Sequence, residues 1–375
     1  MEQSVNVFKY FMFFFYCTCA IQPAFSANNI QTNYLQKLKI NDEEIHALAW
    51  YQNQQPNSDF LLACASQDSV SIASFNIGQR TFTKKLTKKI QANALTWYPT
   101  LPILTYAANN KINLLAYNAE KNKFSLCDTF EPNIGTINAI TWHPTLRLDS
   151  CHVLACSALK NHTHNVYVYL YDFEKRSFTL LQKIQEDASP TTPLVAWRKK
   201  ILTLTYTDKL GFIQNSMYNA KKNAFEPVST EQTSIRVLKK MDWHPTLPII
   251  FGSQAYSSAD SDAKNNGISL WAYDYSSNSF SYLHLIDLLS EEYLSEKHNL
   301  KYIDGSLDLC APCSTIWHPK KSILTFGSKR GVISLWEVTG LEQSLNYDSG
   351  PRSAILDIAT GQDVNIQATN TDAHK

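Results

Sequence analysis

Six tryptophans recur along this chain at similar intervals, and each one ends a short apolar segment. They are Trp50, Trp97, Trp142, Trp197, Trp243 and Trp317, separated by 47, 45, 55, 46 and 74 residues. Repeats of ~20–50 residues are typical of proteins in which one structural unit is copied and each copy packs on its neighbours. The spacing therefore predicts about six copies of one unit over residues 30–338 rather than several unrelated domains.

Each unit contains further short apolar runs after its tryptophan. In the second unit these runs are PILTYAA (102–108), KINLLAYN (111–118) and KNKFSLCDTF (121–130). Within them Ile112, Leu114 and Ala116 alternate with residues that face the other way, and turn residues separate the runs. Alternation with a period of two, bounded by turns, indicates half-buried strands. The sequence predicts an all-β chain with four strands in each unit.

A proline follows four of these tryptophans by two positions, at Pro99, Pro144, Pro245 and Pro319. Proline cannot donate a hydrogen bond to a neighbouring strand, so it belongs at a strand end or in a turn. We therefore expect the first strand of each unit to stop there. The preceding tryptophan is then a structural residue buried between neighbouring units.

The last unit carries the strongest family signal. TIWHPKKSILTF is followed by GSKRGVISLWEV, with Trp317, Pro319, Trp336 and Glu337 at its key positions. This pattern resembles the WD-repeat β-propeller family and is clearest at residues 310–338. The resemblance implies a single β-propeller of about six, or seven, four-stranded blades. Other units depart from the pattern, with Ala73, Ala116, Leu170 or Ser216 near the place of the second tryptophan.

Three segments stand outside the regular repeat. TNYLQKLKIN (32–41) stands before Trp50 as a fourth strand stands before later tryptophans, so we expect it to complete the last blade and close the ring. In the longest gap, Leu285, Leu289 and Tyr293 recur every four residues, which predicts a helical insertion at 284–299. A degenerate seventh blade is the alternative. The polar tail, 339–375, is expected to be poorly ordered.

The first 26 residues have the pattern of a signal peptide. Lys9 precedes a 12-residue apolar run at 10–21, and Ala24-Phe25-Ser26 forms a small-x-small cleavage pattern. The run is shorter than the ~20 residues that span a bilayer. We expect cleavage after Ser26 and a secreted or periplasmic protein with no membrane contact after cleavage. The alternative is an uncleaved N-terminal membrane anchor.

Two groups of residues have the composition of chemical sites. Cys310 and Cys313 form a CxxC motif, which we interpret as a possible local disulfide or as two thiols, with a redox-active pair as the alternative. Cys151, Cys156, His162 and His164 resemble a set of metal ligands, of which at most Cys156 and the two histidines could converge. We interpret them as a core cysteine beside loop histidines, with a metal site as the alternative. We predict no catalytic, cofactor-binding or metal-binding residues, and no cofactor.

Three histidines, at His143, His244 and His318, follow a tryptophan directly. Recurrence at one position of the repeat indicates a structural role, and we expect a hydrogen bond from the ring to a turn carbonyl.

The charge and glycine content restrict the function. Lysine and arginine number 34 against 33 acidic residues, so the net charge of +1 does not favour nucleic acid. With 11 glycines, phosphate-binding loops lack support. We predict a monomeric, non-enzymatic protein-interaction scaffold with protein partners. The alternative is an exported propeller enzyme or ligand-binding protein, lactonase-like or quinoprotein-like, with its site in the central channel.

Overall fold

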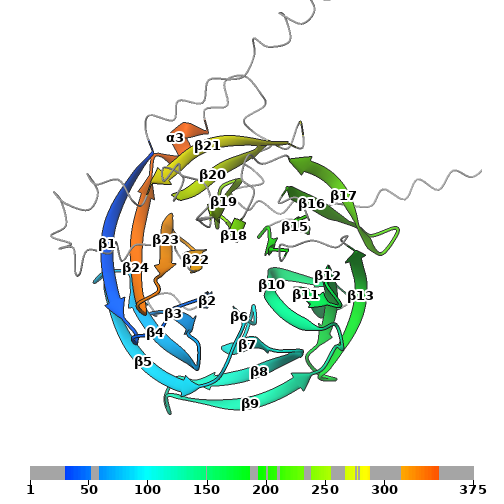
Figure 1. Cartoon of the computed structure of the whole chain (residues 1–375), viewed down its shortest axis with the longest axis horizontal. Coiled ribbons are helices and arrows are strands. Elements are labelled where there is room, and N and C mark those ends of the chain that lie inside the picture. The colour runs from blue at the N-terminus through cyan, green and yellow to red at the C-terminus, as the bar shows by residue number, and fades with distance from the viewer. Residues whose placement is uncertain are drawn as a thin grey trace, which may run out of the picture.

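The chain forms a ring of six antiparallel sheets in the computed structural model (Figure 1). The structure describes residues 30–51, 59–148, 150–185, 193–199, 202–208, 212–231, 238–254, 267–274, 277, 279–287 and 314–345. Each sheet has four strands, so each is one blade of a β-propeller. The predicted all-β propeller of four-stranded blades is confirmed.

Each of the first five blades uses four consecutive strands, A to D from the centre outward. Blade 1 contains β2 (Ala47–Tyr51), β3 (Phe60–Ala65), β4 (Ser69–Asn76) and β5 (Thr81–Lys89). Blade 2 contains β6 (Ala94–Trp97), β7 (Ile103–Ala108), β8 (Lys111–Asn118) and β9 (Lys123–Phe130). Blade 3 contains β10 (Thr136–Leu148), β11 (Cys151–Lys160), β12 (Thr163–Asp172) and β13 (Ser177–Gln185). Blade 4 contains β14 (Val195–Trp197), β15 (Thr203–Thr207), β16 (Ile213–Asn219) and β17 (Ala224–Glu231). Blade 5 contains β18 (Leu238–Trp243), β19 (Ile249–Gln254), β20 (Gly267–Asp274) and β21 (Ser279–Asp287).

Blade 6 joins the two ends of the propeller. It contains β22 (Ser314–Trp317), β23 (Ile323–Gly327) and β24 (Val332–Thr339), and its outer strand is β1 (Gln31–Lys39) from the other end of the ring. β1 pairs antiparallel with β24, from Gln31 opposite Thr339 to Lys39 opposite Val332. The predicted closing strand is confirmed. Because pairing joins segments about 300 residues apart, the ring has no open seam at its ends.

The core of the protein lies between the blades. Six clusters of buried apolar side chains are described, and each combines residues from two neighbouring blades. Inner strands such as β15 and β23 are buried on both faces because a blade packs on each side of them. The outer strand β5 is instead mostly exposed, with Phe82 as its one buried residue. Blades 5 and 6 share one cluster, so no seventh blade separates them.

Every outer strand contains one β-bulge at an equivalent place. The pairing with strand C skips one residue in each blade: Leu35, Lys85, Cys127, Leu181, Val228 and Leu283. A bulge bends a strand and increases its twist, which makes an exposed edge a poor template for pairing with another chain. The six bulges therefore protect the rim of the ring.

Two expectations about the ends of elements need correction. β21 extends to Asp287, so the helix expected at 284–299 is wrong for its first four positions, and 288–299 lie outside the described residues. The propeller also continues past 338, because Thr339 ends β24 and a one-turn helix, α3 (Leu341–Ser344), follows. Leu341 and Leu345 are buried against blades 5 and 6. The remaining tail, 346–375, lies outside the described residues.

The signal-peptide prediction also falls outside the described residues, which begin at Ile30. Within the described part of the chain, no helix has the length and apolar character needed to cross a membrane.

Candidate functional site

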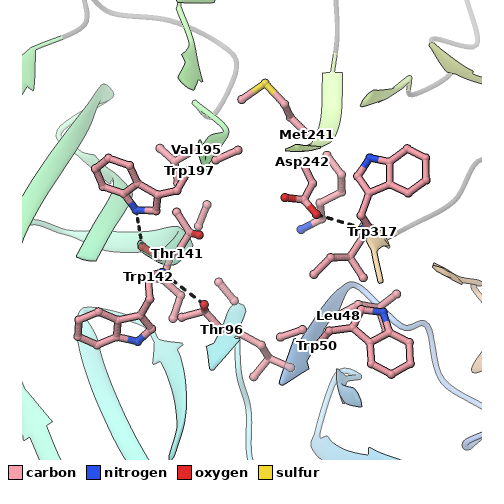
Figure 2. A pocket seen from close by; sticks show the side chains of 18 of the residues that line it. Leu48, Trp50, Thr96, Thr141, Trp142, Val195, Trp197, Met241, Asp242 and Trp317 are labelled. Atoms are coloured by element: carbon pink, nitrogen blue, oxygen red, sulfur yellow. Dashed lines mark hydrogen bonds between the residues drawn. The ribbon is translucent and has the colours of Figure 1, made fainter. Parts of the chain in front are cut away.

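The inner strands of all six blades surround a central cavity of about 430 Å³. All six repeat tryptophans line it, as do Pro99, Pro144, Pro245 and Pro319. Figure 2 shows four of the tryptophans, Trp50, Trp142, Trp197 and Trp317. The sequence therefore identified residues that the fold brings together from the whole chain. Trp336 is separate from them: it lies in the core between blades 5 and 6, 5.4 Å from the ring of Tyr34 of β1.

The prolines occupy their expected places in three blades. Pro99, Pro245 and Pro319 stand two residues beyond the ends of β6, β18 and β22. Pro144 differs because β10 continues to Leu148. The pairing of β10 with β11 nevertheless shifts between Trp142 and Arg147, so Pro144 lies where the regular ladder is interrupted. The prediction that the strand stops at Pro144 is wrong, although its hydrogen-bonding reason holds.

The indole N–H groups connect each blade to the one before it. Trp142, Trp243 and Trp50 donate from Nε1 to the hydroxyls of Thr105, Thr205 and Thr325, at 2.8, 2.9 and 3.0 Å. Each threonine lies on strand B of the preceding blade. A buried indole N–H needs such a partner because an unsatisfied donor costs free energy.

Where strand B offers no hydroxyl, the indole uses the backbone instead. Ala63 and Ala155 stand at the threonine position of blades 1 and 3. Trp97 donates to the carbonyl of Ala49, and Trp197 donates to that of Thr141, both at 3.0 Å. In blade 5 the position is Phe251, whose ring lies 6.2 Å from that of Trp317. Trp317 Nε1 accordingly has no hydrogen-bond partner among the described residues.

The residue after each tryptophan packs on the tryptophan of the next blade. Ring centroids are 5.2 Å apart for Tyr51 with Trp97 and 5.1 Å for Tyr98 with Trp142. The distances are 5.3, 4.7 and 5.0 Å for His143 with Trp197, His244 with Trp317, and His318 with Trp50. In blade 4 the guanidinium of Arg198 lies 5.0 Å from the Trp243 ring. These six contacts run once around the ring and return to blade 1, and we call them the tryptophan belt.

The histidines of the belt are structural, but their hydrogen bonds differ from the prediction. Nδ1 accepts from the backbone N–H of Thr145, Leu247 and Lys320, for His143, His244 and His318 respectively, at 3.3, 3.0 and 3.2 Å. The partner is a turn amide rather than a turn carbonyl, so Nδ1 must be unprotonated. Burial lowers the pKa of His244 and of His318 to about 3, and nearby lysines add to the effect at His318. His244 and His318 are therefore neutral at physiological pH.

Asp242 is the one carboxylate among the described residues that line the central cavity. Its two oxygens accept hydrogen bonds from the backbone N–H groups of Trp243, at 2.9 Å, and of Trp317, at 3.1 Å. Figure 2 shows the bond to Trp317. The carboxylate thus connects blade 5 to blade 6. Desolvation raises its pKa to about 7, although both backbone hydrogen bonds act in the opposite direction.

Besides Asp242, few charged side chains line the central cavity. Its other charged lining residues are Lys199, Lys239 and Lys240, and Lys199 donates to the carbonyl of Pro319 at 3.2 Å. The remaining wall is built mainly from tryptophan, proline, alanine, leucine and threonine. General acid–base catalysis needs a titratable side chain that can reach a substrate. The carboxylate and the histidine acceptors described here instead hold backbone amides.

The cysteines and histidines that resembled chemical sites in the sequence lie in different surroundings. Cys156 is fully buried in β11, and burial raises the pKa of its thiol. His162 is exposed in a turn, whereas His164 is buried in β12. No group of three or more histidine, cysteine or acidic side chains within the described ranges is arranged to hold a metal ion. Cys310 and Cys313 lie outside those ranges.

Comparisons with known proteins leave the family open. No protein-family model matches the chain, and no curated protein matches it. Among solved structures, the chain is similar to one in a structure titled "Crystal Structure of Mitotic Checkpoint Complex". The two are 14% identical with a TM-score of 0.49, over 85% of this chain and 95% of the other. A likeness this distant assigns no function, and the WD-repeat resemblance stays a prediction.

Proposed function

We propose that this protein is a divergent WD-repeat-like propeller that acts after export as a non-enzymatic scaffold for protein partners. The observation that carries the proposal is that the carboxylate and the histidines in and near the central cavity are already engaged in hydrogen bonds to the backbone. The one described carboxylate of this cavity already accepts two backbone hydrogen bonds, and the belt histidines already accept turn amides. The groups best suited to chemistry are thus used to hold the ring together.

A closed ring also supplies what a scaffold needs. Blades fixed by core packing and by the tryptophan belt hold their connecting loops at constant positions, and varied loops on a rigid framework form binding surfaces. We also propose that the mature protein is a monomer.

The enzyme alternative requires acidic or polar side chains that converge on a substrate. A single carboxylate engaged by Trp243 and Trp317 does not provide that arrangement.

The test of the scaffold proposal is chemical crosslinking of the protein in its native compartment, followed by reconstitution. The protein and each crosslinked candidate would be purified separately and mixed, and the complex measured by light scattering. We expect a complex of fixed stoichiometry. Failure of every purified candidate to bind, together with consumption of a metabolite by the protein alone, would contradict the proposal and favour the enzyme.

Export has its own test. The proposal rests on the apolar run at 10–21 and on the cleavage pattern Ala24-Phe25-Ser26. N-terminal sequencing of the protein from its native source is expected to start at Ala27. A chain that retains Met1 and is recovered in the membrane fraction would support the uncleaved anchor instead.

A further inference from the structure

A second hollow, of about 420 Å³, lies between blades 1 and 2 and shares no lining residue with the central cavity. Its wall comes from four connections at one end of these blades: β1–β2, β3–β4, β5–β6 and β7–β8. The lining residues are Glu44, His46, Gln67, Gln91, Ala92, Asn93, Ala108 and Asn109. We call this hollow the loop pocket.

Three polar side chains of the loop pocket each use a nitrogen atom in a hydrogen bond to another residue of the chain. The ring of His46 contacts the carbonyl of Ala92 through Nε2 at 2.6 Å. Because a carbonyl oxygen only accepts, Nε2 carries the hydrogen and Nδ1 is an acceptor. Gln91 donates from its side-chain nitrogen to Asp68 at 3.1 Å, and Asn93 donates in the same way to the carbonyl of Ile137 at 3.3 Å.

These bonds determine which hydrogen-bonding groups of the loop pocket remain available to a ligand. A side-chain amide has two N–H donors and one carbonyl oxygen. These bonds use one N–H of Gln91 and one of Asn93, so the oxygens of both amides are left as acceptors, as is Nδ1 of the neutral His46 ring. Glu44 adds an exposed carboxylate, and no lysine or arginine lines the pocket. The lining is rich in acceptors and carries a negative charge.

A ligand that complements this lining carries a positive charge and several hydrogen-bond donors in different directions. A guanidinium group has five N–H donors on a planar, permanently charged group, whereas an ammonium is a compact point charge with three. Ala92 and Ala108 add small apolar surface for the methylenes of a long side chain.

We propose that the loop pocket binds the guanidinium group of an arginine side chain presented by a protein partner. This inference rests on the scaffold function, because it names the chemistry of one contact that a partner makes. Charge-assisted hydrogen bonds to Glu44 supply the attraction, and the oxygens of Gln91 and Asn93 orient the group.

The test is titration of short peptides into the purified protein, with binding followed by calorimetry. The probes are N-acetylated, C-amidated Gly-Arg-Gly and the same peptide with citrulline, which keeps the shape of arginine without its charge, or with lysine. We expect the arginine peptide to bind about tenfold more tightly than either, since one charge-assisted hydrogen bond is worth a factor of this size. Equal binding of the arginine and citrulline peptides, or of the arginine and lysine peptides, overturns the proposal.

The matched variants are Glu44→Gln and Glu120→Gln. Both residues are exposed and both changes remove one negative charge, but Glu120 lies in the β8–β9 turn at the opposite end of blade 2. We expect Glu44→Gln to weaken the arginine peptide about tenfold and Glu120→Gln to leave it unchanged. Equal effects of the two variants contradict the loop pocket as the site.

The two proposals fail in distinguishable ways. If Glu44→Gln binds every reconstituted partner as tightly as the unchanged protein does, the arginine site is wrong while the scaffold function stands. If the arginine peptide binds at the loop pocket but no purified partner forms a complex, the scaffold function is wrong.

Discussion

At the scale of single residues, the partner of each tryptophan indole depends on one position in the preceding blade. Threonine supplies a hydroxyl in three blades, alanine leaves the task to a backbone carbonyl in two, and Phe251 supplies nothing to Trp317. The repeat tolerates all three solutions because the tryptophan ring is held by packing on both sides. The hydrogen bond adds stability to a position that packing already determines.

Replacing Thr325 measures how much its hydrogen bond to the Trp50 indole adds to stability. Thr325→Val keeps the shape of the side chain but leaves the Trp50 indole without its 3.0 Å acceptor. We expect the free energy of unfolding to fall by about 1–2 kcal/mol, the cost of one buried unsatisfied donor. Chemical denaturation would measure it, with Thr83→Val on the exposed face of β5 as the control. An equal loss in both variants would contradict the role of the hydroxyl.

Asp242 predicts a pH effect of definite sign. Its carboxyl has a pKa of about 7 in the folded protein against 3.8 as its ordinary value, so between these values the folded state binds the proton more tightly. The contribution of Asp242 to stability therefore falls as the pH rises through this window. Asp242→Asn removes the titration, so the stability of the variant relative to the unchanged protein should improve from about pH 4 to about pH 8. Melting temperatures that differ by a constant amount across this range would contradict the raised pKa.

The buried histidines predict a slope of the opposite sign. His318 has a pKa of about 3 when folded against its ordinary 6.5, so the unfolded chain binds the proton more readily. Its contribution to stability is present above about pH 6.5 and is lost as the pH falls toward 3. His318→Gln keeps an acceptor without titrating, and its stability should fall less on acidification than that of the unchanged protein. A parallel loss in both proteins would show that folding does not lower the pKa of His318.

Single residues also show which contacts could not be predicted from the sequence. Recurrence of histidine after tryptophan was enough to predict a structural role, but the partner is a turn amide because the ring nitrogen that faces the turn has no hydrogen. A sequence does not reveal which nitrogen is protonated. Asp242 was missed because its role depends on Trp317 in the next blade, far away in the chain. Tyr51 and Arg198 would have been found by comparing the position after each tryptophan across the units.

At the scale of elements, closure of the ring depends on a tight approach between the β23–β24 turn and the end of β1. Ile40 donates its backbone N–H to the carbonyl of Gly331 at 2.8 Å. Gly331 has a φ of +69°, and a Cβ there would lie 2.2 Å from the Asn41 carbonyl oxygen. A side chain at this position is therefore excluded both by backbone conformation and by space.

Gly331→Ala should loosen the closing strand. We expect a loss of about 1–3 kcal/mol in unfolding free energy, typical of forced backbone strain, with faster amide exchange in β1 than in β3. Gly78→Ala is the matched control, since its Cβ would lie 3.5 Å from the nearest atom, in a turn without a positive φ. Deletion of 30–41 should reduce stability further. Unchanged thermal melting after that deletion would contradict closure by β1.

The elements were predictable where the apolar pattern is regular, and the helix at 284–299 shows why the rest was not. The helix was predicted from the four-residue spacing of Leu285, Leu289 and Tyr293, which is the pattern of a helix face. Leu285 instead lies in β21, opposite Ser269 of β20. The bulge at Leu283 adds one residue to this strand, so its apolar residues do not keep the regular alternation of a strand, and bulges cannot be read from a single sequence. The closing strand, in contrast, was predicted because each later unit provides a template for it.

At the scale of the whole molecule, six core clusters and the tryptophan belt make the ring a single cooperative structure. Each blade is held by both neighbours, and the last contact of the belt, from His318 to Trp50, returns to blade 1. The polar groups nearest the axis are part of this framework. Loops that do not pack between the blades, unlike the β23–β24 turn with Gly331, are the parts that can differ in chemistry at little cost to the ring.

Hydrogen exchange measured by mass spectrometry, on the protein alone and with a reconstituted partner, tests this account most directly. We predict that the inner strands β2, β6, β10, β14, β18 and β22 exchange slowly in both states, and that the partner protects loops at the ends of the blades. Rapid exchange of the inner strands in the protein alone, or protection confined to the wall of the central cavity, would contradict a rigid ring that binds through its loops.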